Sequence, residues 1–234
     1  MKDRVRIIDY LRVLAILVMI AYHLAYDLST FYGFQINVFS GPWKLLEQAC
    51  AGLFLILVGW SFLLSWKRTP VWQKYVKRGI GILGYGIIVS IATFLFDPTT
   101  YVRFGILHLI GVSIMMLPLF TKLGRWVLVP ACIVIALGSQ IPRGTVTSSF
   151  VLPIGFTIPG FQSVDYFPLL PWFGITLLGL AIGNAYRQKT PSTGTPGRLS
   201  TIIAAVSKHS LMIYMLHQPI LLIMLRIILG KPLA

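Results

Sequence analysis

The sequence predicts an all-α integral membrane protein, a bundle of about seven transmembrane helices with the N-terminus in the cytoplasm and the C-terminus outside. Three observations support this fold class. Hydrophobic residues make up 56% of the 234 residues and charged residues only 11%. The apolar residues occur in long runs, and the basic residues cluster between those runs. Ordinary soluble domains contain about 25% charged residues, because their surface must be largely polar. We expect residues 1–234 to form a single transmembrane domain.

The apolar runs approach or exceed the roughly 20 residues that a helix needs to cross a bilayer. In chain order the predicted spans are Ile7–Leu28, Leu46–Trp66, Tyr75–Phe96, Arg103–Phe120, Trp126–Ser139, Pro168–Tyr186 and His209–Leu229. The fifth is the shortest. The first is too long for a signal peptide and has no small-residue cleavage site behind it, so we expect it to remain as a span.

Two connections have distinctive compositions. The long connection from residue 140 to 167 is rich in Pro, Gly, Ser and Thr. Its apolar piece Phe150–Phe161 is interrupted by Pro153 and Pro159, which predicts an interfacial or re-entrant segment. The composition of Gln188–Leu199 predicts a flexible hydrophilic loop.

The basic residues predict the orientation of the bundle. With the N-terminus inside, fifteen of the 20 lysines and arginines fall on the inner face and five on the outer face. This is a strong positive-inside bias, and it would weaken if the fifth span were removed. The net charge of +14 therefore belongs to clusters at a membrane face, and we expect no nucleic-acid partner.

Ionisable side chains line one face of the first predicted span, where lipid makes them costly and therefore candidates for function. Asp9, Arg12, His23 and Asp27 fall within an arc of about 60° at 100° per residue. Asp9 and Arg12 fit a structural ion pair equally well. His23 and Asp27 are spaced i, i+4, so Asp27 could fix the imidazole tautomer, as the orienting carboxylate does in acyl-transfer enzymes.

Other segments place polar groups at a similar depth. His23 and His108 each lie about 6–8 Å outward of the middle of their spans. Arg103 and Asp165 lie at the predicted outer mouth, and His217 lies near the midplane. We therefore expect one polar cavity that opens to the outer face.

Structural alternatives remain open for each of these residues. Arg103 could extend to the outer interface, and His108 could bond a backbone carbonyl in the core. Asp165 could cap the sixth predicted span. His217 with Gln218 and Pro219 could mark a polar kink.

Five sequence blocks carry a family resemblance. They are RVRIIDYLRVLAILVMIAYHLAYDL (4–28), FLILVGWSF (54–62), RFGILHLIG (103–111), DYFPLLPWFG (165–174) and SLMIYMLHQP (210–219). In this order and spacing they resemble the bacterial branch of the heparan-alpha-glucosaminide N-acetyltransferase catalytic-domain family. Val13 stands where the family usually has Gly, and we expect the protein to lack the additional N-terminal domain and helices of lysosomal relatives.

The resemblance implies a transmembrane acyltransferase in the bacterial inner membrane. Such a protein moves an acetyl or other acyl group from cytoplasmic acyl-CoA to a sugar or glycan amine or hydroxyl on the outer face. Acetyl-CoA would be the co-substrate, and we expect no metal. Membrane lipids are further expected partners, and a homodimer is left open.

Within this interpretation the candidate residues take different roles. The resemblance implies that His23 is the catalytic group, either as general base or as acyl carrier. Asp27 would orient it, and Arg103 or His108 would donate to the thioester oxygen. The candidates for binding the acceptor are Asp165, Tyr166, His217 and Gln218, and those for binding the CoA head group are Arg6, Arg12 and Lys208.

Two other classes of protein also fit the polar stripe. A proton-coupled transporter or flippase would use His23 and Asp27 as a proton relay. The sequence shows no internal repeat, which disfavours that class. A non-enzymatic subunit would use the stripe to bind another helix.

Overall fold

The computed structural model describes residues 6–142, 144–186 and 197–232. Within these ranges the protein is helical, and its only β-type pairing is an isolated bridge between Phe104 and Tyr166. This confirms the predicted all-α class. The chain divides into two compact units, one formed by residues 1–54 and 188–234 and the other by residues 55–187.

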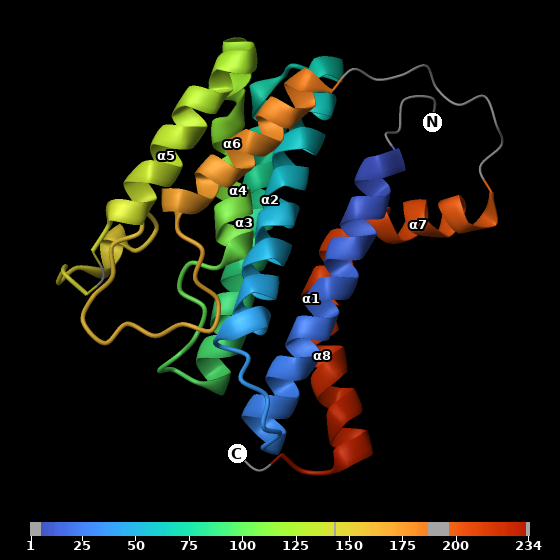
Figure 1. Cartoon of the computed structure of the whole chain (residues 1–234), viewed down its shortest axis with the longest axis vertical. Coiled ribbons are helices and arrows are strands. Elements are labelled where there is room, and N and C mark those ends of the chain that lie inside the picture. The colour runs from blue at the N-terminus through green and yellow to red at the C-terminus, as the bar shows by residue number, and fades with distance from the viewer. Residues whose placement is uncertain (1–5, 143, 187–196, 233–234) are drawn as a thin grey trace. The chain divides into compact units, whose positions relative to one another are not determined.

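The first unit joins the beginning of the chain to its end. It contains α1 (Arg6–Tyr32), the N-terminal half of α2 (Gly41–Arg68), α7 (Arg198–Lys208) and α8 (Ser210–Leu229). Both α7 and α8 pack against α1. In Figure 1, α8 runs along α1, whereas α7 lies across the N-terminal end of α1.

The second unit contains two closely packed helix pairs, α3 with α4 and α5 with α6. Its elements are the C-terminal part of α2, α3 (Trp72–Phe96), α4 (Ile106–Met116), η1 (Leu117–Val127), α5 (Leu128–Gln140), η2 (Ser149–Val151) and α6 (Leu169–Ala185). Gly124 within η1 has non-helical angles (φ 53°, ψ −123°) and interrupts the helical path. Figure 1 accordingly draws α4 and α5 as separate rods.

Glycines allow the helices of this second unit to approach closely. A Cβ atom built on Gly79 of α3 would press on the Met115 side chain and lie 2.6 Å from Gly111 O of α4. One built on Gly179 of α6 would press on Ile56 O of α2. Small residues at such contacts are how membrane helices gain van der Waals packing where no hydrophobic driving force acts between them.

Five helices in the described residues are long and apolar enough to cross a membrane: α1, α2, α3, the 35-residue stretch Ile106–Gln140, and α8. The fifth predicted span and all but the first three residues of the fourth fall within Ile106–Gln140. The sixth corresponds to α6, which is apolar but only 17 residues long. All seven apolar runs are thus helical, while the length criterion gives five candidate spans.

The long connection between α5 and α6 contains little regular structure. Among its described residues, 141–142 and 144–168, the helical element is η2, one turn of 3-10 helix. Two backbone hydrogen bonds, Leu169 N to Pro153 O and Leu170 N to Ile154 O, fasten the connection to the start of α6.

The segment before the last predicted span differs from the prediction. Residues 188–196 of the predicted hydrophilic loop Gln188–Leu199 lie outside the described residues. Leu199, its last residue, already belongs to the helix α7. This helix was missed because Gly197 and the hydrophilic residues before it dominate the local composition.

We predict that Gly79→Ala destabilises the protein by about 1–3 kcal/mol, because the added methyl group forces α3 away from α4. Thermal unfolding of the purified protein in detergent measures the change. Gly81→Ala on the same helix is the matched control, since a Cβ there meets nothing within 4 Å. Equal unfolding temperatures for the two variants would contradict the close helix contact.

Candidate active site

His23 is held by its own helix. Its Nδ1 atom lies 2.9 Å from Met19 O. A carbonyl oxygen can only accept a hydrogen bond, so Nδ1 carries the proton, and in the neutral ring Nε2 keeps its lone pair. The structure therefore presents Nε2 of His23 as the basic or nucleophilic atom.

Asp27 does not orient His23, contrary to the sequence-based expectation. Its Oδ1 atom accepts a 2.6 Å hydrogen bond from Gln218 Nε2 of α8. Side chains on a helix lean toward its N-terminus, which brings the His23 ring to Met19 O rather than toward Asp27. Asp27 is fully buried, and it connects α1 to α8 instead.

His217 lies beside His23. The two ring centroids are 4.6 Å apart, and the ring planes are nearly perpendicular at 85°. His217 Nδ1 donates to Tyr214 O over 2.6 Å. In its neutral form this second ring also keeps its lone pair on Nε2.

His23, Asp27, His217 and Gln218 thus form one group, which we call the α1–α8 cluster. Asp27 and Gln218 are 191 positions apart in the sequence. Three buried atoms of the cluster have no hydrogen-bond partner among the described residues: Asp27 Oδ2, His217 Nε2 and Gln218 Oε1. Leaving a buried polar atom unpaired costs about 1–3 kcal/mol, and such atoms are rare. Their concentration here leaves polar groups free to receive a bound molecule.

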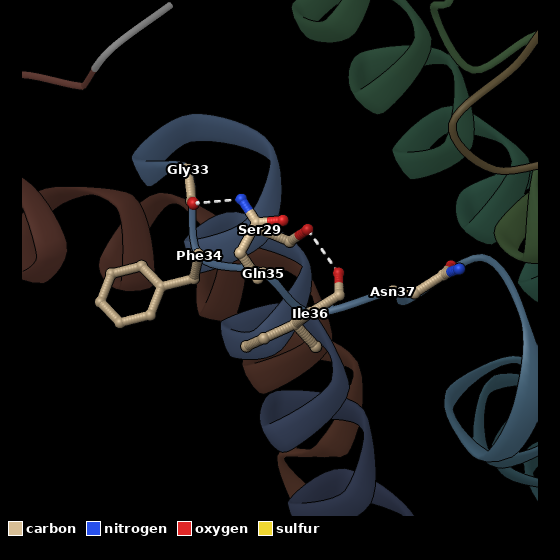
Figure 2. Close-up of a pocket in the computed structure, with 6 residues that line it drawn as sticks. All are labelled: Ser29, Gly33, Phe34, Gln35, Ile36 and Asn37. Carbon is tan, nitrogen blue, oxygen red and sulfur yellow. Dashed lines mark hydrogen bonds between the residues drawn. The ribbon is translucent and has the colours of Figure 1, made fainter.

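A surface hollow lies beyond the cluster, at the end of α1. It has a volume of about 320 Å³ and is lined by Ser29, Gly33, Phe34, Gln35, Ile36 and Asn37. Ser29 Oγ closes the turn by donating to Ile36 O. Figure 2 shows Phe34 and Asn37 pointing to opposite sides, so the lining side chains do not converge. We therefore place the candidate site at the α1–α8 cluster.

His108 has the opposite tautomer from His23 and His217. It lies in the second unit, where its Nδ1 atom accepts a 3.2 Å hydrogen bond from Gly105 N. In the neutral ring the proton is then on Nε2, which becomes a donor. Asp165 Oδ2 accepts from Ile106 N over 3.1 Å, so Asp165 caps the first turn of α4 rather than the start of α6.

Aromatic rings surround Arg103 in the second unit. Its guanidinium carbon lies 5.0 Å from the centroid of Tyr101 and 5.2 Å from that of Phe161. Tyr166 packs against Phe161 and donates through its hydroxyl to Leu152 O over 2.8 Å. Arg103 and Tyr166 therefore share one aromatic environment.

Asp97 stabilises the connection between α3 and α4, which carries Tyr101 and Arg103. Its carboxylate accepts hydrogen bonds from the Thr99 main chain and from the Thr99 and Thr100 hydroxyls, at 2.5–2.9 Å. These hydrogen bonds, that from Thr100 foremost, lower the pKa of Asp97 to about 2. Because the pKa is lower than in the unfolded chain, the turn is most stable above about pH 4 and loses this contribution as the pH falls toward 2.

Arg12 belongs to a third polar group, at the start of α1. Arg12 Nη1 donates to Ser207 Oγ over 3.0 Å, and Ser207 Oγ donates to Asp9 Oδ1 over 2.6 Å. Ser207 is the second-last residue of α7 and is buried. Lys208 follows it and is exposed, as is Arg6 at the first position of α1. The three predicted CoA-binding residues therefore lie in the same unit. Arg6 and Arg12 are near the start of α1, and Lys208 is the last residue of α7.

The structure divides the predicted site residues between the two units. The first unit holds the α1–α8 cluster with Arg6, Arg12 and Lys208, and the second holds Arg103, His108, Asp165 and Tyr166. The single outward-facing cavity predicted from the sequence stays a prediction.

The sequence matches the family described as heparan-alpha-glucosaminide N-acetyltransferase, catalytic, over residues 4–219. The chain belongs to this family. The resemblance read from the five sequence blocks is thereby confirmed, and the protein is a multi-pass membrane protein of an acyltransferase family. The comparisons with curated proteins and with solved structures find no match.

Two contributors to these groups were missed by sequence reasoning. Ser207 links Asp9 and Arg12 to α7, and the Met19 carbonyl sets the tautomer of His23. The only available signal for Ser207 was its place in an amphipathic stretch. A backbone carbonyl leaves no signal in the side-chain pattern.

We predict that Gln218→Leu destabilises the protein by about 2–4 kcal/mol, because it leaves the buried Asp27 carboxylate without its partner. Asp27→Leu should also destabilise by leaving Gln218 unpaired. The double variant should lose less than the two single losses together. Unfolding in detergent measures all three. Strictly additive losses would show that the two side chains do not interact.

Proposed function

We propose that the protein transfers an acetyl group from acetyl-CoA to an amine or hydroxyl of a sugar or glycan. The observation that carries this proposal is the His23–His217 pair, with each neutral ring bonded to a carbonyl through Nδ1. Acyl transfer to an amine or hydroxyl needs a group that removes the acceptor proton or carries the acyl group. An unprotonated Nε2 atom suits both tasks.

The proposal includes seven crossings, with the N-terminus in the cytoplasm of a bacterium. The 17 residues of α6 extend about 26 Å, close to the roughly 30 Å hydrocarbon core. Ile106–Gln140 supplies two crossings that meet at Gly124, with Lys122 and Arg125 on either side of the break. That arrangement retains the positive-inside bias. In the proposal, acetyl-CoA binds from the inner face and the acceptor from the outer face.

The simplest route uses one histidine as the base. His23 Nε2 takes the proton of the acceptor amine or hydroxyl as the acceptor attacks the thioester carbonyl. The C–S bond then breaks, and the CoA thiolate leaves and receives the proton from His23. In this route His217 contributes to holding the acceptor, which agrees with its predicted role.

The neighbouring histidine also admits a covalent route. His23 Nε2 attacks the thioester carbonyl, the C–S bond breaks, and CoA leaves as its thiolate. The acylated His23 can no longer act as base, so His217 Nε2 takes the acceptor proton when the acceptor attacks the acyl-imidazole. His23 then leaves as the neutral ring, and His217 passes the acceptor proton to the CoA thiolate. The 4.6 Å between the two ring centroids fits this division of roles.

Residues outside the cluster are proposed to stabilise the oxyanion and to bind CoA. Oxyanion stabilisation requires a hydrogen-bond donor, and the tautomer of His108 makes its Nε2 a donor. Arg103 is the second candidate donor. The exposed Arg6 is suited to CoA phosphates, whereas Arg12 is already engaged by Ser207.

We predict that His23→Ala lowers the rate of acetyl transfer by about 100-fold or more, the usual contribution of general base catalysis. Purified protein in nanodiscs is incubated with labelled acetyl-CoA and a panel of amino sugars and glycans. Binding, CoA release and acetylated product are measured. His209→Ala is the matched control, because this exposed histidine also bonds the carbonyl four residues before it.

Three outcomes separate the routes and test the proposal. Label retained on the protein in His217→Ala, but not in His23→Ala, supports the covalent route. Loss of transfer in His23→Ala with no label retained on any variant supports the single-base route. No acetyl-CoA binding by the unmodified protein would overturn the proposed function.

A further inference from the structure

The helix α7 has the composition of a membrane-surface helix. Its 11 residues extend about 16 Å, too short to cross a bilayer. Leu199, Ile202, Ile203 and Val206 fall within an arc of about 100°. No residue of α7 is acidic, and basic residues stand at both ends, Arg198 and Lys208.

Burial within the structure separates two faces of α7. Ser207 is 1% exposed and is bonded to Asp9 and Arg12 of α1, which fixes the inner face. Leu199 and Ile202, in contrast, are 67% and 53% exposed. Two of the four apolar residues of α7 are thus uncovered, while Ser207 anchors the helix to α1.

The contact with α1 places α7 at the membrane boundary. Asp9 lies in the first turn of α1, so the Ser207 hydrogen bonds join α7 to the very end of a candidate span. Figure 1 shows α7 extending to the side from that end of α1, at a steep angle to it. After α7, only His209 separates it from α8, another candidate span. A helix between two span ends and directed across them lies in the plane of the bilayer surface.

We propose that α7 is an interfacial helix that binds anionic phospholipid. Leu199 and Ile202 enter the boundary of the acyl chains, and Arg198 and Lys208 contact the lipid phosphates. Such helices bind through buried apolar area together with attraction to anionic lipids. The charge of α7 favours a lipid over an apolar protein partner, because two cations without any acid match an anionic surface. The same end of α1 carries the basic residues predicted to face the cytoplasm, the side of a bilayer where anionic lipid attracts such residues.

Spin labels test the orientation of α7. Leu199→Cys and Thr201→Cys are labelled in full-length protein carrying Cys132→Ser, since Cys132 is exposed and Cys50 is buried. The protein is placed in nanodiscs that contain phosphatidylglycerol. The label at position 199 should be relaxed more by oxygen, and that at 201 more by a water-soluble nickel complex. A label at 199 that is most accessible to nickel, or that shows spin–spin broadening from a second copy, would overturn the proposal.

Paired charge variants test the lipid partner. Arg198→Gln/Lys208→Gln removes both α7 cations, and Arg226→Gln/Lys231→Gln removes two exposed cations near the end of α8 as the control. A basic side chain at an anionic surface strengthens binding about fivefold. Removing both α7 cations should therefore weaken phosphatidylglycerol binding roughly tenfold to thirtyfold in titrations followed by native mass spectrometry, with phosphatidylcholine unaffected.

The control pair should change phosphatidylglycerol binding much less. Equal losses in the two double variants would overturn the proposal, because the attraction would then follow total charge rather than α7. Unchanged lipid binding together with weakened acetyl-CoA binding in the α7 variant would overturn it as well, assigning Arg198 and Lys208 to CoA. Neither result depends on acetyl transfer, so failure here is distinct from failure of the proposed function.

Discussion

The hydrogen bond between Asp27 and Gln218 is the contact on which the candidate site depends. Water is scarce in a bilayer core, so a buried carboxylate there must find its partner within the protein. Gln218 supplies that partner from the last helix. Because His217 precedes Gln218 and His23 lies one turn before Asp27, the same contact sets the two histidines side by side. One hydrogen bond thus gives the buried carboxylate its partner and sets the two histidine rings beside each other.

The three membrane-embedded histidines show how a backbone neighbour selects side-chain chemistry. His23 and His217 each face a carbonyl oxygen through Nδ1, and so keep a lone pair on Nε2. His108 faces a backbone N–H group through Nδ1, and so keeps a proton on Nε2. Two are thereby suited to accept a proton and the third to donate a hydrogen bond, although all three are the same residue type.

The all-helical class and the positions of the apolar helices could be predicted from the sequence, because the length of an apolar run is a property of the chain itself. The polar stripe on α1 was also visible, since it follows from helical periodicity. The partner of Asp27 could not be predicted, because a histidine four residues away on the same helix is a more obvious candidate than a glutamine 191 positions away. The helix α7 was not predicted, because the residues that precede it are hydrophilic. The contact at Gly79 could not be found either, since glycine frequency does not indicate which glycine meets another helix.

The joining of the first helix to the last has a consequence for biosynthesis. Asp27 enters the membrane early, but Gln218 is synthesised 191 residues later, which takes roughly 10–40 s at 5–20 residues per second. Throughout that interval α1 carries a carboxylate without its eventual partner, so the insertion machinery or a shallow position must shelter it. When α8 inserts, Gln218 pairs with the Asp27 carboxylate, and the α1–α8 cluster is complete. A chain that ends before α8 therefore keeps a first helix whose Asp27 lacks its Gln218 partner.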